Sequence, residues 1–285
     1  MLRHGPPDKG PLARETSQSK RKAGKPDRPM HRLAIVRRLE AVGFRAWPAA
    51  SIQYDGSWQV RLTAGHPSKR LNSVNPLDPS DHRDVEKRVE RAAQRFSAYG
   101  RPLIFRQSPL APPQLDAYFD AKGWRRFDET TVMMADIRKL DLDATLDHLP
   151  IRELGRYVDA NIQVHGRDKS IKPGLTEVIS SIRPSSGWFV IEEPGAGPVA
   201  TALCVHDSDM AGIFEVATRR DRRNKGYGRE VVTAALRWAR MRGAEQAWLQ
   251  VETTNEAARD LYERFGFEEI YRYDYRQAPD KSADE

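Results

Sequence analysis

The chain has 285 residues, which is long for one compact domain and sufficient for two, and no apolar run in it is long enough to cross a membrane. Its single cysteine excludes an intrachain disulfide, and the apolar neighbours of Cys204 predict a buried side chain rather than a nucleophile. The net charge of +7 would favour nucleic-acid binding if it were spread along the chain.

The basic residues are concentrated at the N-terminus. Residues 1–29 hold eight Lys or Arg against three acids, a charge of +5, which leaves +2 for the rest of the chain. The segment is rich in Pro, Gly, Ser and Lys, and it has too few apolar residues to fold or to form a signal peptide. We expect a disordered basic tail, or sequence upstream of a start at Met30, on a cytoplasmic protein. A nucleic-acid tether is the less favoured alternative.

Region 30–139 has the pattern of a folded lobe. The predicted elements are, in chain order, a helix over 33–42, hairpin strands over 50–54 and 58–62, a third strand over 69–74, a helix over 84–99, a strand over 103–105, a helix over 113–121 and a strand over 130–134. The run 70–75 is unusually polar for a core strand. Its side chains either line a cleft between two lobes or cap a strand end.

Region 150–276 follows a linker over 140–149 and precedes a C-terminal tail over 277–285. The predicted elements are helices over 154–163 and 174–182, strands over 188–192, 199–206 and 211–218, a helix after Gly226, a strand over 248–252, a helix capped by Thr254 or Asn255 that ends at Gly266, and a further strand. His165, in the predicted loop between the first two helices, is either a substrate contact or merely exposed.

A glycine-bearing turn joins the strand over 211–218 to the next helix. It reads Arg223-Asn224-Lys225-Gly226-Tyr227-Gly228. Glycines let such a turn tighten, so that several backbone N–H groups converge on an anion at the positive end of the helix. Arg223 and Lys225 add positive charge there. The turn therefore predicts a phosphate site, although a glycine pair alone is a weak signal.

A second segment downstream strengthens the prediction. Arg223, Gly226 and Gly228 fit the pyrophosphate loop R/Q-x-x-G-x-G/A of the GNAT superfamily of N-acetyltransferases. The second signature of that superfamily, an asparagine followed by a helix ending in Leu-Tyr and then Gly-Phe, is matched by Asn255, Leu261, Tyr262, Gly266 and Phe267. Over about residues 150–276 the chain resembles this superfamily.

The resemblance implies an α/β (α+β) fold with two GNAT-like lobes, each a mixed, largely antiparallel sheet flanked by helices. It implies acetyl-CoA as co-substrate, no metal, no membrane partner and little role for nucleic acid. The residues expected to bind the cofactor are Val216, Ala217, Thr218, Arg223, Asn224, Lys225, Gly226, Tyr227, Gly228, Arg229 and Asn255.

The first lobe is expected to be a degenerate copy. Aligned on glycine, Tyr118-Phe119, Gly123 and Trp124 correspond to Leu261-Tyr262, Gly266 and Phe267. The turn over 75–84 carries prolines instead of a glycine pair, so the lobe is expected to be structural or to shape the substrate site. A generic strand-helix-strand ending is the alternative.

The chemistry needs a base and a proton donor. Tyr262 is the donor that the resemblance implies, although it could also be a core residue. Glu215 is the predicted base, provided that a bulge reverses its strand alternation. The alternatives are a structural Glu215 paired with an arginine, and Glu252 as the base.

The predicted function is transfer of acetyl from acetyl-CoA to a primary amine by direct attack. A catalytically silent acyl-CoA-binding or interaction module is the alternative. The acceptor, a small molecule or a peptide amine, carries no motif in this sequence.

Overall fold

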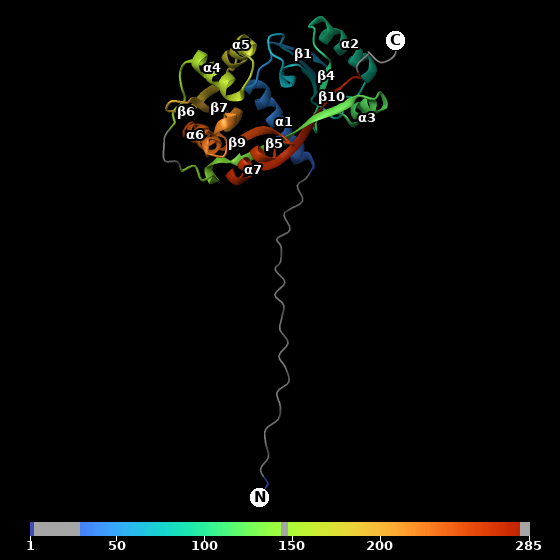
Figure 1. The fold of residues 1–285 in the computed structure, drawn as a ribbon. Coiled ribbons are helices and arrows are strands. Elements are labelled where there is room, and N and C mark those ends of the chain that lie inside the picture. The colour runs from blue at the N-terminus through green and yellow to red at the C-terminus, as the bar shows by residue number, and fades with distance from the viewer. Residues whose placement is uncertain (3–28, 144–147, 280–285) are drawn as a thin grey trace.

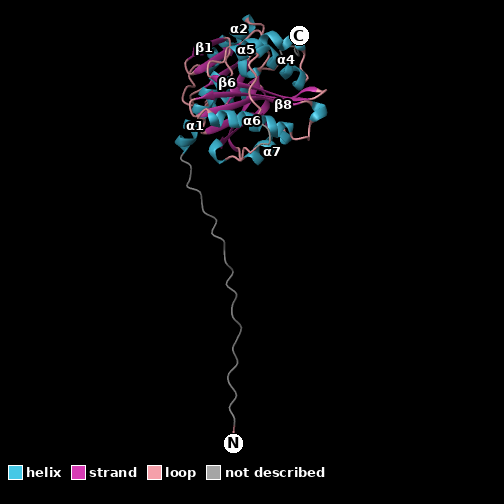
Figure 2. Ribbon diagram, turned by 90° about the vertical axis from the view of Figure 1, so that its left-hand side faces the viewer, coloured by secondary structure: helices cyan, strands magenta, loops and turns pink. Residues whose placement is uncertain are grey.

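The computed structural model describes residues 1–2, 29–143 and 148–279, with the side chains of 29–32 excepted, and the described residues form one ten-stranded sheet. The strand order is β1-β2-β3-β4-β10-β5-β9-β8-β7-β6. Only β3–β4 and β8–β9 pair in parallel. Figure 2 shows the strands running through the middle of the molecule with helices on both sides.

The first half of the chain contributes five of these strands. Its elements are α1 (Pro29–Ala46), β1 (Ser51–Asp55), β2 (Trp58–Leu62), a 3-10 turn (Lys69–Leu71), β3 (Ser73–Pro76), α2 (Val85–Ala98), β4 (Ile104–Gln107), α3 (Pro113–Ala121), β5 (Arg125–Asp136) and a 3-10 turn (Ile137–Lys139).

The second half contributes the other five strands. Its elements are α4 (Leu154–His165), a 3-10 turn (Lys169–Ile171), α5 (Lys172–Ser180), β6 (Ser185–Glu193), β7 (Gly197–Asp207), β8 (Met210–Thr218), a 3-10 turn (Arg220–Arg222), α6 (Tyr227–Met241), β9 (Gln246–Glu252), α7 (Glu256–Phe265) and β10 (Glu268–Gln277).

The two halves repeat one topology and exchange their last strands. The order β1-β2-β3-α2-β4-α3-β5 recurs as β6-β7-β8-α6-β9-α7-β10. In each half the final strand leaves its own half: β5 pairs with β9, and β10 pairs with β4. The two exchanged strands also pair with each other, and Figure 1 shows them side by side at the centre of the molecule. Each half therefore completes the sheet of the other.

Three hydrophobic clusters hold the layers together. One cluster lies beneath α1, α4 and α5 on one face of the sheet. On the opposite face, one cluster lies under α6 and α7 and another under α2 and α3. The alternation of β5 separates the faces, because Val132 joins the first cluster and Met133 the α6 cluster. Helix α1 thus covers strands of both halves.

A buried ion pair ties α1 to the exchanged strand. Glu40 of α1 receives both guanidinium arms of Arg106 from β4, and it accepts a 2.5 Å hydrogen bond from the hydroxyl of Tyr271 on β10. The Arg106 guanidinium also lies 3.6 Å from the centre of the Tyr273 ring. The two charged side chains are only 4% and 3% exposed, so neither charge is solvated in the absence of the other.

The predicted helices and strands are found, with three differences. The mixed, largely antiparallel sheet flanked by helices is confirmed, but the lobes share one sheet instead of having one each. The spacing of apolar residues shows which face of a strand is buried, but it does not show which strands lie beside it. The exchange of β5 and β10 therefore leaves no signal in the sequence. The predicted strand over 69–74 begins as a 3-10 turn and becomes β3 only at Ser73. His165 is the last residue of α4 rather than part of a loop, because α4 extends beyond the predicted end at 163 and is capped by Gly166.

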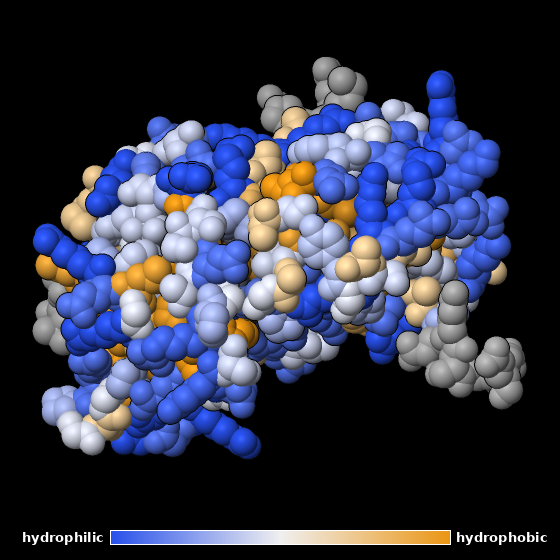
Figure 3. Space-filling view, turned by 90° about the horizontal axis from the view of Figure 1, so that it is seen from above, coloured by the Kyte–Doolittle hydropathy of each residue, from blue (hydrophilic) through white to orange (hydrophobic). Residues whose placement is uncertain are grey.

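Some predictions fall outside the description. Most of the basic tail (3–28), part of the linker (144–147) and the end of the C-terminal tail (280–285) lie outside the described residues. No helix in the described part of the chain is long and apolar enough to cross a membrane. Figure 3 shows a face that is mostly hydrophilic, with small hydrophobic areas among polar side chains.

The buried pair predicts a large loss of stability on substitution of Arg106. Arg106→Met leaves the Glu40 carboxylate buried without its cation, which should lower the free energy of unfolding by about 3–5 kcal/mol in urea titrations. The control is Lys122→Met, because Lys122 and its partner Glu86 are more than half exposed. That variant should leave the free energy of unfolding nearly unchanged, because a solvent-exposed ion pair is screened by water. Equal losses of unfolding free energy for the two variants would contradict the stabilising role of the buried pair.

Candidate active site

The central feature of the second half is a gap between β8 and β9. The two strands pair only from Met210 to Ile213 on β8 and from Gln246 to Leu249 on β9. Beyond that point β8 stays paired with β7 to Thr218, and β9 stays paired with β5 to Glu252. The strands therefore separate, and the gap forms a cleft of about 810 Å³ that exposes one edge of β8.

The glycine-bearing turn closes one end of this cleft. Gly226 precedes α6 with φ +89°, and no side chain caps the helix. Asn224 also has a positive φ, +61°. Gly228 lies against β8 and α7, since a Cβ atom there would come within 3.3 Å of Thr218 Oγ1 and 3.6 Å of Leu261 Cδ2. The first N–H groups of α6 have no partner within the helix, so this end of the cleft could hold a phosphate.

Most of the predicted cofactor-binding residues line the cleft. They are Val216, Ala217, Thr218, Arg223, Asn224, Gly226, Tyr227, Gly228, Arg229 and Asn255. Lys225 is the exception, because its side chain is exposed and is not among those that line the cleft. Asn255 has a second task, because its side chain accepts a 3.2 Å hydrogen bond from the Ala258 N–H and caps α7. Arg264, near the end of α7, also lines the cleft, and the sequence did not indicate it.

Tyr262 lies in the opposite wall, on α7. Its ring is 6% exposed and packs edge-on against Phe267 at 6.0 Å. Its hydroxyl has no hydrogen bond with any residue in the described ranges. Burial raises the pKa of Tyr262 to about 12, so the phenol keeps its proton at neutral pH. The residue thus has features of both alternatives, a core side chain and a proton or hydrogen-bond donor facing the cleft.

A bulge places Glu215 at the inner end of the cleft. Thr201 of β7 opposes Ala217, whereas Leu203 opposes Phe214, so β8 has one extra residue between these pairs. Glu215 has φ +49°, a left-handed conformation that is uncommon for a residue with a side chain. The bulge turns this side chain to the Phe214 side, toward Arg167, while Val216 packs toward α6. Glu215 and Val216 therefore still lie on opposite faces of the strand, and the bulge does not bring Glu215 to the Val216 face as the predicted base required.

The carboxylate of Glu215 is already paired. Its Oε2 lies 2.5 Å from Nη1 of Arg167 and 3.7 Å from Nε2 of His165, and its side chain is 6% exposed. Burial alone would raise the pKa of Glu215, but the charge of Arg167 holds it below its ordinary value. Burial also lowers the pKa of His165, so its imidazole is neutral at neutral pH. The arginine-paired Glu215 considered from the sequence is therefore present, in a position that faces the cleft.

A second cavity, the chamber, begins where the cleft ends. It has a volume of about 400 Å³ and lies between the two halves. Five residues line both cavities: Arg70, Arg167, Glu215, Gln250 and Glu252. Among them Glu252 has no hydrogen bond or ion pair through its side chain with any described residue. Gln250 is oriented by Tyr273 of the exchanged strand, whose hydroxyl donates a 2.9 Å hydrogen bond to Oε1.

The first half supplies the far wall of the chamber. Trp47 follows α1, residues 66–70 precede β3, and Asp128 and Thr130 lie on β5. Among the residues that line the chamber, the sequence did not single out Arg70, Arg167, Gln250 and His66. The polar run 70–75 was the available signal, and Arg70 does line the cleft and the chamber, as one of its two interpretations predicted.

The comparisons with known proteins identify the family of the chain. The family model described as the C-terminal region of the probable histone acetyltransferase Rv0428c matches residues 34–276. The chain belongs to this acetyltransferase family. The match spans both halves, so family membership includes the shared sheet and the chamber as well as the cleft.

Individual similar proteins are named as N-acetyltransferases or as GNAT proteins. The uncharacterized N-acetyltransferase YobR of Bacillus subtilis is 26% identical over 247 residues, covering 85% of this chain and 98% of YobR. A GCN5-related N-acetyltransferase from Kribbella flavida superposes with a TM-score of 0.65 at 19% identity, over 87% of this chain and 96% of that one. A tandem GNAT protein from the clavulanic acid biosynthesis pathway superposes with a TM-score of 0.57 at 14% identity, over 86% of this chain and 89% of that one. These two structures show the same fold, and the resemblance to the GNAT superfamily is confirmed.

The ion pair of Glu215 predicts a pH-dependent contribution to stability. Because its folded pKa lies below the unfolded value of about 4.3, the pair stabilises fully above that value and is lost as pH falls through the folded pKa. Glu215→Gln should therefore lower the free energy of unfolding most near pH 7, and this cost should shrink as pH falls below about 4.3 toward the folded pKa. Urea titrations across this range measure it. Glu268→Gln, at an exposed position, is the control. A cost that does not change with pH would contradict the pairing.

Proposed function

We propose that this GNAT acetyltransferase transfers the acetyl group of acetyl-CoA to a primary amine by direct attack on the thioester. The observation that carries the proposal is the meeting of the cleft and the chamber at Glu215, Gln250 and Glu252. A cofactor in the cleft and an acceptor in the chamber would bring their reacting groups together there. The amine nitrogen forms a bond to the acetyl carbon, the carbon–sulfur bond breaks, and CoA leaves as a thiol.

The cofactor would bind along the second half. Its pyrophosphate fits the unpaired N–H groups at the start of α6, with Arg223 and Arg229 on the same wall. The pantetheine arm resembles a peptide, and the edge of β8 that β9 leaves free from Glu215 to Thr218 can pair with it. A backbone N–H of this edge would also stabilise the negative charge that develops on the thioester oxygen.

The amine must lose a proton before it attacks, and we assign this step to Glu252. Glu252 lines both cavities and has no ion pair among the described residues, whereas Arg167 neutralises Glu215. A carboxylate without a nearby cation attracts an ammonium group and can pass its proton to water. Glu215, the base predicted from the sequence, is the second candidate and would act only if Arg167 moved away.

We assign stabilisation of the leaving thiolate to Tyr262. With a pKa of about 12, this phenol is a weaker acid than a thiol of ordinary pKa about 8.5. Full proton transfer to the thiolate is therefore uphill, and the hydroxyl acts first as a hydrogen-bond donor to sulfur. Such a bond is strongest when the charge is present, so it favours the departing thiolate over the bound thioester.

A catalytically silent acyl-CoA-binding module remains the second candidate function. The pairing of Glu215 with Arg167 favours it, because that carboxylate is not available as a base. Release of the CoA thiol from acetyl-CoA in the presence of amines separates the two functions. Transfer supports the enzyme, and tight acetyl-CoA binding without transfer to any amine supports the silent module.

Removing the hydroxyl of Tyr262 should separate its two roles. Tyr262→Phe keeps the ring packing, so Tm and CoA affinity should stay nearly unchanged while turnover falls by at least about tenfold. The control is Tyr118→Phe on α3, the matching helix of the first half, which should keep full turnover. Turnover within a factor of about two of wild type together with a lower Tm would show that Tyr262 is a core residue and no donor.

A further inference from the structure

The charges of the chamber are unevenly paired. Three basic and three acidic side chains line it: Lys69, Arg70, Arg167, Asp128, Glu215 and Glu252. Lys69 pairs with Asp128, and Arg167 pairs with Glu215. Within the described ranges, the side chains of Arg70 and Glu252 make no hydrogen bond and no ion pair. The chamber therefore presents one unpaired cation and one unpaired anion.

Arg70 is held in place by its backbone and by two aromatic rings. It belongs to the 3-10 turn before β3, which the fully buried Leu71 anchors. Asn72 ties this turn to the preceding loop, because its Nδ2 donates to the carbonyl oxygens of His66 at 2.7 Å and Ser68 at 3.0 Å. The guanidinium lies 5.7 Å from the ring centre of Trp47 and 6.0 Å from that of Phe214.

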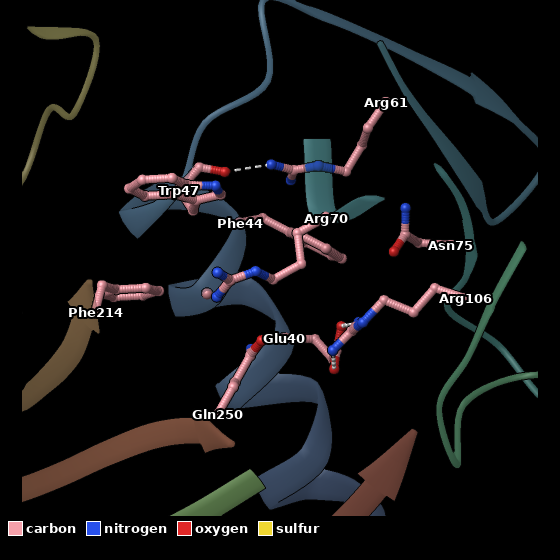
Figure 4. Close-up of a pocket in the computed structure, with 10 residues that line it drawn as sticks. Glu40, Phe44, Trp47, Arg61, Arg70, Asn75, Arg106, Phe214 and Gln250 are labelled. Carbon is pink, nitrogen blue, oxygen red and sulfur yellow. Dashed lines mark hydrogen bonds and ion pairs between the residues drawn. The ribbon is translucent and has the colours of Figure 1, made fainter. Parts of the chain in front are cut away.

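Figure 4 shows how Arg70 differs from the arginines around it. Arg61 is drawn with a bond to the Trp47 carbonyl and Arg106 with bonds to Glu40, whereas the Arg70 guanidinium has no such bond and ends near Trp47, Phe214 and Gln250. A half-buried guanidinium that lacks an anion gives up hydration without replacing it. It is therefore arranged in advance to receive a carboxylate, which guanidinium binds with two parallel hydrogen bonds.

From these contacts we infer that the acceptor is a small zwitterion, a free amino acid or a primary amine of similar size that carries a carboxylate. The inference rests on the proposed function and names its substrate class. The ammonium group faces Glu252, which also lines the cleft, so that the nitrogen lies beside the thioester. The carboxylate binds Arg70.

The chamber fits this class better than other amines. Its volume of about 400 Å³ suits a ligand of amino-acid size, and Trp47, Tyr273 and Tyr275 provide aromatic wall for a side chain. A diamine would bring two cations to a chamber with one unpaired carboxylate. A lysine side chain of a protein would leave Arg70 without an anion.

The test compares matched acceptors with two variants. The common amino acids are assayed with acetyl-CoA, each as the free acid and as its carboxamide, with putrescine as a diamine. For the wild type we expect kcat/KM at least about tenfold higher for the best free acid than for its carboxamide, because the carboxamide leaves Arg70 unpaired. Arg70→Gln should remove this preference by lowering kcat/KM for the free acid alone. Arg183→Gln removes an exposed arginine outside both cavities and should retain it.

Several outcomes would overturn the inference. Equal kcat/KM for free acids and carboxamides would refute the zwitterion site and leave the proposed reaction intact. A preference for putrescine would have the same meaning. If Arg70→Gln slows both members of a pair equally, Arg70 has only a structural role. If no amine is acetylated, the proposed reaction is wrong, and calorimetric titration of amino acids into the CoA-saturated protein then decides: binding that Arg70→Gln abolishes supports the zwitterion site, and absence of binding refutes it.

Discussion

The exchange of β5 and β10 is the constraint on which the rest of the structure depends. Because β5 pairs with β9 and β10 pairs with β4, neither half has a complete sheet without the other. The exchange also fixes how the halves face each other. It brings Asp128 and Thr130 of β5 next to Glu252 of β9, and it brings Tyr273 of β10 to Gln250. The chamber thus exists because the sheet is shared.

Repetition of the topology makes the chemical difference between the halves clear. Before α6, a turn with Gly226 and Gly228 leaves the helix N–H groups open to the cleft. Before α2, the corresponding segment contains Asp81, whose carboxylate accepts hydrogen bonds from Ser57 N–H at 2.8 Å and from Arg88 at 2.9 Å. The first half thus places its own carboxylate near the start of its helix, and it contributes residues that line the chamber, such as Arg70.

The sequence predicted the elements and most of the residues that line the cleft, because both depend on local pattern. Apolar spacing marked the helices, and the glycine-bearing turn marked the start of α6. The exchange, the ion pair of Glu215 with Arg167 and the position of Arg70 depend on contacts between distant segments, which periodicity does not record. Even so, the polarity of 70–75 pointed to the cleft, which Arg70 lines. The remaining site residues, Gln250 and His66, stand in segments with no unusual pattern.

The central claim is that the second half binds the cofactor while the first half completes the acceptor side. A crystal structure with saturating acetyl-CoA tests this claim most directly. The account predicts one cofactor per chain, with its pyrophosphate at Gly226–Gly228 and its thioester at the opening to the chamber, within reach of Glu252. A second cofactor between β3 and β4, or a thioester directed away from the chamber, would contradict it.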